Sequence, residues 1–200
     1  MPTSRVEAFS DGVIAIAITL LVLQIKIPST GVESLRHALL HQWPAYFSYA
    51  VSFLVIGVMW VNHHQIFSHV GRADRVVQFL NLGLLMSIAF VPFPTAVVGE
   101  FINSSSGEQT AAILYGVCFT IIALFFNALW QYVIRTPGIL EADADPRVIR
   151  GITRSYRPGM PLYASATAIA FVSPIASVAL FGAIAIFYML SPARFGGAAG

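Results

Sequence analysis

The sequence predicts an all-α, polytopic membrane protein with six transmembrane helices. Of its 200 residues, 57% are hydrophobic and 10% are charged, whereas ordinary globular chains carry roughly a quarter charged residues. The mean hydropathy is +0.77, and the apolar residues gather in stretches long enough to cross a bilayer. We therefore expect one transmembrane domain over residues 1–200 and no separate soluble domain.

Charge and cysteine content exclude several other classes. Eleven Lys and Arg against nine Asp and Glu give a net charge of +2, which is too little for a nucleic-acid-binding surface. The single cysteine, Cys118, excludes a disulfide scaffold and a cysteine-rich metal site. We expect it to be a small buried apolar side chain.

Four spans follow from the first part of the chain. The first covers residues 6–27 and is closed by Pro28, because proline cannot continue the hydrogen bonds of a helix. The second, 45–67, follows an interfacial tryptophan and a proline that suits a helix start. The third, 76–98, contains Pro92 and Pro94 and should be kinked there, and the fourth, 110–134, is the least interrupted.

The last part of the chain supplies the other two spans. Residues 135–157 are polar and charged, with room for a short helix outside the membrane. The apolar tract that follows is too long for one span and is broken at Ser173 and Pro174. We therefore expect two shorter antiparallel helices, 159–172 and 175–190.

Basic residues in the short loops predict the orientation. With the N-terminus inside, the outer segments hold only Lys26 and Arg36, and both termini are cytoplasmic. The inner segments then hold nine arginines, namely Arg5, Arg72, Arg75, Arg135, Arg147, Arg150, Arg154, Arg157 and Arg194. We expect no cleaved signal peptide, because residues 1–11 carry two acids and no small-residue cleavage site precedes Pro28.

The first span has two different faces. At about 100° per residue, one stripe contains Arg5, Phe9, Gly12, Ile16, Thr19, Leu20, Leu23 and Ile27, while Ser10 and Asp11 fall on the opposite flank. Aliphatic stripes of this kind commonly face lipid or a core. Repeated around a symmetry axis, the same side chains would instead form stacked apolar rings that gate by dewetting, beside a hydroxyl that replaces part of an ion's hydration shell.

Intramembrane polar residues gather at one depth, near the inner ends of the spans. This polar belt contains Ser10, Asp11, Asn62, His63, His64, Gln65, Gln78, Asn81, Asn127, Trp130 and Gln131. Polar groups in hydrocarbon need internal partners, so we expect one connected network centred on Asp11 and His63 or His64. The outer half of the bundle shows nothing comparable.

Two chemical functions are disfavoured by helix geometry. Adjacent histidines diverge by about 100° and cannot share a metal as an i, i+4 pair can, so we expect no fixed metal site. Ser10 and Asp11 diverge in the same way, and no nucleophile elbow is present, so we expect no enzyme. Trp60 and Phe67 are most simply packing residues.

The string Arg5-x-x-x-Phe9-Ser10-Asp11-Gly12, followed directly by the aliphatic run 14–23, resembles the first-helix signature of the transmembrane protein 175 family. Trp60-x-x-His63-His64 on the second span is also similar to that family. Its members are bacterial relatives of the lysosomal potassium channel.

The resemblance implies a potassium channel fold without a pore loop, assembled as a homotetramer in the bacterial inner membrane. The first helices would line the pore, with Ile16 as the narrowest ring, Leu20 and Leu23 as further rings, and Thr19 tied to potassium preference. Arg5, Ser10 and Asp11 would lie in an interhelical network. The candidate motif and network residues are therefore Arg5, Phe9, Ser10, Asp11, Trp60, Asn62, His63 and His64.

The expected function is passive, potassium-selective cation flow, with potassium held transiently near Ile16 and Thr19. No cofactor is expected, and the expected partners are further copies of the chain and membrane lipid, not nucleic acid. Two alternatives stay open. One is a proton-conducting channel or proton-coupled transporter that uses Asp11 and His63 or His64, and the other is a non-conducting scaffold or intramembrane enzyme.

Overall fold

A computed structural model describes residues 3–29, 31 and 34–190, and Arg194 of the predicted inner segments lies outside them. The described residues form helices joined by loops, with one isolated bridge between Val70 and Leu140. Four helical stretches are long and apolar enough to cross a membrane: Thr3–Gln24, Trp43–Phe67, Arg75–Phe101 and Glu108–Arg135. The all-helical membrane architecture is therefore confirmed.

The first span ends earlier than its sequence predicts. Helix α1 (Thr3–Leu20) passes into the 3-10 turn η1 (Leu21–Gln24), and Ile25 is already extended. Pro28 therefore follows the helix at a distance and does not close it. The short helix α2 (Leu35–His41) was not predicted from sequence. Ser34 caps its N-terminus, and the Ser34 hydroxyl accepts a hydrogen bond from the His37 amide.

The middle spans follow the predicted tracts closely. Helix α3 (Trp43–Phe67) has Pro44 in its first turn. The kink expected in the third span is a break at Val91 between α4 (Arg75–Phe90) and α5 (Pro92–Phe101). Helix α6 (Glu108–Arg135) is the longest of the described helices, with 28 residues.

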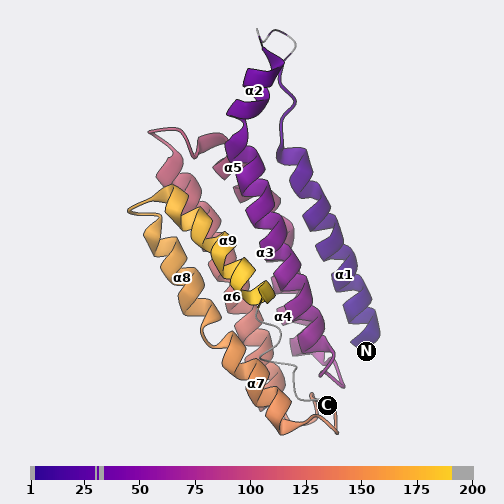
Figure 1. Cartoon of the computed structure of the whole chain (residues 1–200). Coiled ribbons are helices and arrows are strands. Elements are labelled where there is room, and N and C mark those ends of the chain that lie inside the picture. The colour runs from indigo at the N-terminus through magenta and orange to yellow at the C-terminus, as the bar shows by residue number, and fades with distance from the viewer. Residues whose placement is uncertain (1–2, 30, 32–33, 191–200) are drawn as a thin grey trace.

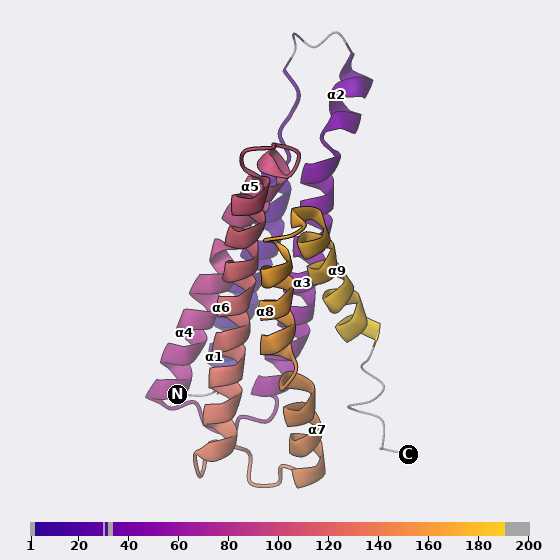
Figure 2. The ribbon, with the colours of Figure 1, turned by 90° about the vertical axis from the view of Figure 1, so that its left-hand side faces the viewer.

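Three shorter helices follow α6. Helix α7 (Pro146–Tyr156) lies in the polar segment, and residues 170–173 separate α8 (Gly159–Ile169) from α9 (Pro174–Leu190). The eleven residues of α8 measure about 16 Å, about half the thickness of a bilayer core. Figures 1 and 2 place α7 and the N-terminus at one end of the bundle and α2 at the other.

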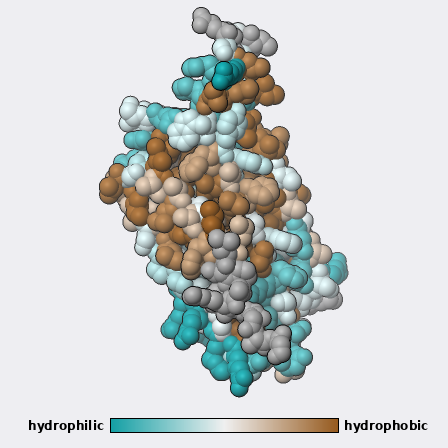
Figure 3. Space-filling model, in the orientation of Figure 1, coloured by the Kyte–Doolittle hydropathy of each residue, from teal (hydrophilic) through white to brown (hydrophobic). Residues whose placement is uncertain are grey.

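Helix α6 lies against α4, α5, α8 and α9, while α1 packs mainly on α3 and α4. The α6–α8 contact is close at Gly116, where an added Cβ would lie 2.6 Å from Thr167 Oγ1. Small residues let membrane helices approach in this way. In Figure 3 an apolar band separates two hydrophilic ends of the visible face, which is the surface pattern of a protein that spans a bilayer.

The half of the bundle nearer to α2, which the sequence predicts to be the outer half, also holds a buried polar cluster, contrary to the expectation from sequence. The Ser52 hydroxyl forms hydrogen bonds of 2.8 Å with Thr95 Oγ1 and 2.9 Å with the Tyr115 hydroxyl. Because hydroxyl side chains are common in apolar helices, this cluster has no distinctive sequence pattern. It joins α3, α5 and α6.

Candidate functional site

Helix α1 buries one face and leaves the opposite face uncovered in the protomer. Its buried residues are Val6, Ser10, Ile14 and Ala17, and Leu21 of η1 is buried beyond them. The stripe predicted from sequence is exposed: 61% of Ile16 and 71% of Leu23 remain accessible, and Phe9, Gly12, Thr19 and Leu20 are exposed beside them. The stripe therefore does not belong to the protomer core.

Thr19 is the hydroxyl residue of this stripe. Its Oγ1 donates a 2.9 Å hydrogen bond to the Ile16 carbonyl one turn earlier. The hydroxyl proton is thus directed to the helix backbone, and the oxygen keeps acceptor capacity on its exposed side. An oxygen of this kind next to an aliphatic side chain suits weak coordination of a cation.

The buried face of α1 is fixed by Ser10. Its hydroxyl donates to the Val6 carbonyl at 2.7 Å and accepts from Asn81 Nδ2 at 2.9 Å. Asn81 Oδ1 lies 2.9 Å from His63 Nε2, so with this amide orientation the His63 Nε2–H is the donor. The His63 ring stacks on Phe67 with centroids 4.4 Å apart. Ser10, Asn81 and His63 join α1, α4 and α3, and we call them the buried triad.

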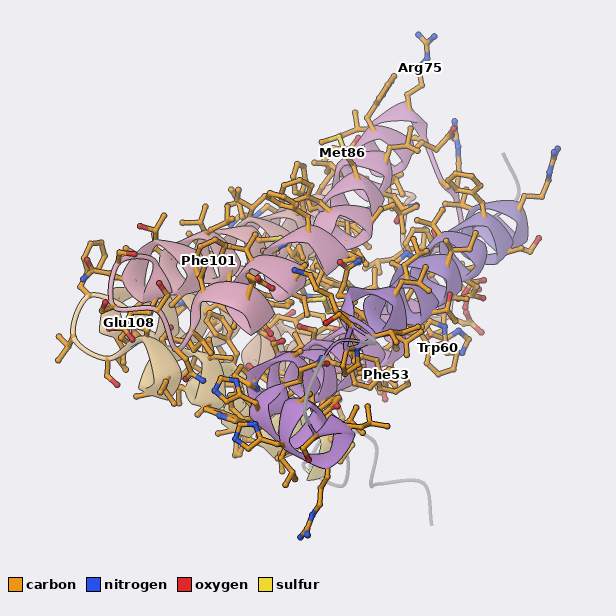
Figure 4. All side chains as sticks on the ribbon, turned by 90° about the horizontal axis from the view of Figure 1, so that it is seen from above. Phe53, Trp60, Arg75, Met86, Phe101 and Glu108 are labelled. Atoms are coloured by element: carbon orange, nitrogen blue, oxygen red, sulfur yellow. The ribbon has the colours of Figure 1, made fainter. Side chains whose placement is uncertain are left out.

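Asp11 belongs to a different contact. Its Oδ1 accepts a 2.9 Å hydrogen bond from Trp60 Nε1 on α3. Trp60 is 48% exposed and, with Phe53, lies along the outer side of α3 (Figure 4). Beyond the packing expected from sequence, Trp60 therefore donates its indole N–H to the motif carboxylate.

The single network predicted from sequence is divided into separate groups. Ser10 and Asp11 diverge around α1, so one enters the buried triad and the other reaches Trp60. His64 Nδ1 lies 3.5 Å from Glu7 Oε1 at the rim of the bundle, a contact that sequence reasoning missed. The one feature of the sequence that could have indicated this contact is that Glu7 and His64 lie at the same depth in neighbouring helices.

Three further residues of the polar belt, Asn62, Asn127 and Trp130, attach α7 to the bundle. Trp130 Nε1 donates to Thr153 Oγ1 at 3.0 Å, and Asn127 Nδ2 donates to the Tyr156 carbonyl at 3.3 Å. The Tyr156 hydroxyl donates to the Asn62 carbonyl at 3.1 Å, so the described contact of Asn62 uses its backbone. Tyr156 lies outside the predicted spans and was not among the candidates from sequence.

Arg5 and Phe9 line a hollow of about 160 Å³ between α1 and α4, with Gln78 and Leu82 on its α4 side. Both side chains are exposed in the protomer. The candidate motif and network residues therefore fall into five places: this hollow, the buried triad, the Asp11–Trp60 contact, the His64–Glu7 contact and the contact of the Asn62 carbonyl with Tyr156.

These features define a polytopic helical membrane protein whose first helix is anchored by polar contacts on one face and uncovered on the other. A family model for the endosomal/lysosomal potassium channel TMEM175 matches residues 5–92. The chain is also 46% identical to a potassium channel of Streptomyces collinus, over 93% of this chain and 91% of that protein. The chain belongs to the TMEM175 family, which is a family of ion channels and not of enzymes.

Two further comparisons bear on the fold and on the permeant ion. The crystal structure of a lysosomal potassium-selective channel TMEM175 homologue from Chamaesiphon minutus superposes with a TM-score of 0.85 at 43% identity, covering 94% of this chain and 96% of that one. The endosomal/lysosomal proton channel TMEM175 of Gallus gallus is 36% identical over 68% of this chain and 28% of its own length.

Proposed function

We propose that the protein is a potassium-selective cation channel that conducts passively through a homotetrameric pore lined by α1. The exposed stripe of Ile16, Thr19, Leu20 and Leu23 carries the proposal, because it combines aliphatic side chains with one hydroxyl on a face that the protomer leaves open. The similarity to potassium channels supports the choice of ion. No cofactor takes part.

Assembly of four copies supplies what one protomer lacks. A single α1 cannot enclose a conduit, so the stripe needs copies of itself around an axis. Large side chains beside α1 are also exposed, including Phe53 and Trp60 on α3 and Phe79 and Met86 on α4, and Figure 4 shows three of them pointing outward. These side chains suit contacts between subunits, which would also cover the Asp11–Trp60 pair.

Four copies of Ile16 form the constriction in this proposal. A narrow ring of aliphatic side chains resists wetting and so limits ion flow. The Thr19 oxygens lie one turn outward and offset part of the cost of dehydration, so that potassium resides transiently between the two rings. The buried triad holds the rotation of α1, which keeps the stripe on the axis.

We further infer that the whole chain is one transmembrane domain of six spans. Besides the four long stretches, α8 and α9 would be the two shorter spans, of which the α8 helix itself covers about half of the bilayer core. The N-terminus and α7 lie at the same end of the bundle, and α7 carries Arg147, Arg150 and Arg154. The excess of arginine at this end supports a cytoplasmic location for it in a bacterial inner membrane.

Flux from liposomes tests the function. Purified protein is reconstituted in potassium-loaded vesicles, and ion efflux is followed against sodium-loaded vesicles and a proton gradient, with the oligomer mass determined in detergent. We expect efflux with potassium exceeding sodium, from a particle of four chains. Absence of flux from correctly assembled protein would refute the channel proposal.

A proton-conducting channel is the second candidate. The vertebrate relative named as a proton channel favours it, and Asp11, His63 and His64 supply groups that exchange protons. This candidate predicts currents that follow the proton gradient and disappear when His63 and His64 are both replaced by Gln. Potassium currents that persist in that variant would decide for the first candidate.

A further inference from the structure

Helix α7 has an apolar face on the bundle and an arginine face turned away from it. Ile152 is fully buried, Ile149 packs on the core, and Tyr156 reaches α3 through its hydroxyl. Arg147, Arg150, Arg154 and Arg157 are exposed and recur at spacings of three and four, which places them on one stripe of the helix. We call these four residues the arginine stripe.

The arginine stripe has no carboxylate partner within ion-pair distance among the described residues. Three acids precede the helix, Glu141, Asp143 and Asp145, and the carboxylate of Asp145 is engaged with the Arg147 amide at 2.7 Å. These acids lie at the end of α7 that is remote from α8. Positive charge is therefore uncompensated at the other end, around Arg154 and Arg157, where the chain enters the apolar helix α8.

A narrow cleft of about 50 Å³ begins at this same junction. Tyr156 and Gly159, on either side of Arg157 and Pro158, line one end of it. The remaining wall is predominantly apolar, with Met59 of α3, Phe126 of α6 and Met160 of α8. Met160 is 41% exposed, so this part of the lining is accessible from the protein surface.

We propose that the arginine stripe and this cleft together bind an anionic phospholipid of the adjoining leaflet. The phosphate binds Arg154 and Arg157, with Arg150 one turn away. Each guanidinium group can donate two parallel hydrogen bonds to phosphate oxygens. Part of one acyl chain enters the cleft beside Met160. The site rests on the proposed orientation, which puts α7 at the level of the inner headgroups, where anionic lipids attract basic segments.

Native mass spectrometry of the intact oligomer tests the site. Protein is released from nanodiscs of equal phosphatidylglycerol and phosphatidylcholine, and retained lipid is counted for wild type, Arg150→Gln/Arg154→Gln/Arg157→Gln, and Arg72→Gln/Arg75→Gln/Arg135→Gln. The second triple variant removes the same charge from exposed arginines of the α3–α4 loop, α4 and α6. Each basic residue near the surface contributes about fivefold in affinity, so we expect the α7 variant to lose its preference for phosphatidylglycerol by at least about tenfold. The control variant should keep it.

Two further arms identify the source of the phosphate. Ala123, which lines the cleft on α6, is changed to Leu, with Ala183→Leu on the exposed side of α9 as the matched control. Ala123→Leu should lower phosphatidylglycerol retention severalfold, and millimolar glycerol phosphate should not displace the lipid. Equal retention by both triple variants, or displacement by glycerol phosphate, would overturn the proposal.

This readout is independent of ion flux. A protein that retains phosphatidylglycerol as expected and carries no potassium would refute the channel proposal and support the lipid site. A conducting protein whose α7 variant still prefers phosphatidylglycerol would support the channel proposal and refute the lipid site. Tetramer mass in the same spectra shows that each variant is assembled.

Discussion

The indole N–H of Trp60 donates a 2.9 Å hydrogen bond to the carboxylate of Asp11, and so joins the motif of the first helix to the motif of α3. Both side chains are exposed in the protomer. Their contact therefore lies at the border of the surface that we propose to be covered by a neighbouring subunit.

Replacing Trp60 by Phe should weaken the oligomer. The change keeps an aromatic ring but removes the donor, so the Asp11 carboxylate loses its described partner at a surface that assembly desolvates. A hydrogen bond to a charged group contributes about 1.5–3 kcal/mol. We expect the free energy of oligomer assembly to fall by an amount near the lower end of this range. The tetramer fraction on dilution in detergent measures it. Trp43→Phe is the control, since this indole on the same helix is exposed and has no described hydrogen bond; equal weakening by both changes would contradict the assigned role.

Asn81→Ala should destabilise the fold itself. It removes the amide that joins Ser10 to His63 and leaves the buried His63 Nε2 without a partner. Leaving a buried polar group unsatisfied costs about 1–3 kcal/mol, which thermal unfolding in detergent would detect. Gln78→Ala, one turn earlier, removes only a 3.3 Å bond to the Ala73 carbonyl and should cost much less. A similar loss in both variants would show that the triad does not hold α1.

The placement of the spans was predictable from sequence, but the pairing of polar residues was not. Residues 110–134 were expected as a helix because nothing interrupts the apolar run, and α6 matches them within two residues. The break at Val91 followed from Pro92. In contrast, the partner of Ser10 depends on how α4 is rotated against α1, and hydropathy does not encode that rotation. The same limit explains why no hydrogen-bond partner was predicted for Trp60 and why Tyr156 was overlooked.

Acid should weaken the anchoring of α4 through Asp74. The Tyr132 hydroxyl donates to its Oδ2 at 2.7 Å and the Val77 amide to its Oδ1, and these bonds hold the pKa of Asp74 below its usual value. A carboxyl group whose pKa is depressed by folding stabilises the fold above its unfolded pKa of about 3.9, and this contribution is lost as the pH falls through the lower folded value.

Asp74→Asn isolates that charge, because asparagine still caps the helix. We expect the variant to be less stable than wild type at pH 7, by less than about 1 kcal/mol since the site is solvated. The difference should be smaller at pH 3, which lies below the unfolded pKa. Unfolding midpoints at the two pH values measure it, and a difference that stays constant would exclude the charge as its cause.

Ile16→Asn should wet the proposed constriction. An amide in place of the aliphatic side chain lowers the dewetting barrier, so potassium flux should rise severalfold while the preference over sodium declines. The liposome assay described above measures both quantities. Val22→Asn is the control, since this exposed residue lies off the stripe. Unchanged flux and selectivity in Ile16→Asn would remove Ile16 from the pore.

The central claim is that the uncovered stripe of α1 faces water, and thiol accessibility tests it most directly. In a Cys118→Ala background, Leu20→Cys on the stripe and Ile186→Cys on the exposed side of α9 are each treated in liposomes with a charged, membrane-impermeant methanethiosulfonate reagent. We predict that the thiol at position 20 reacts and that potassium flux then stops, while the thiol at position 186 stays unmodified. If both thiols remain equally protected in assembled protein, the stripe faces lipid and α1 does not line a pore.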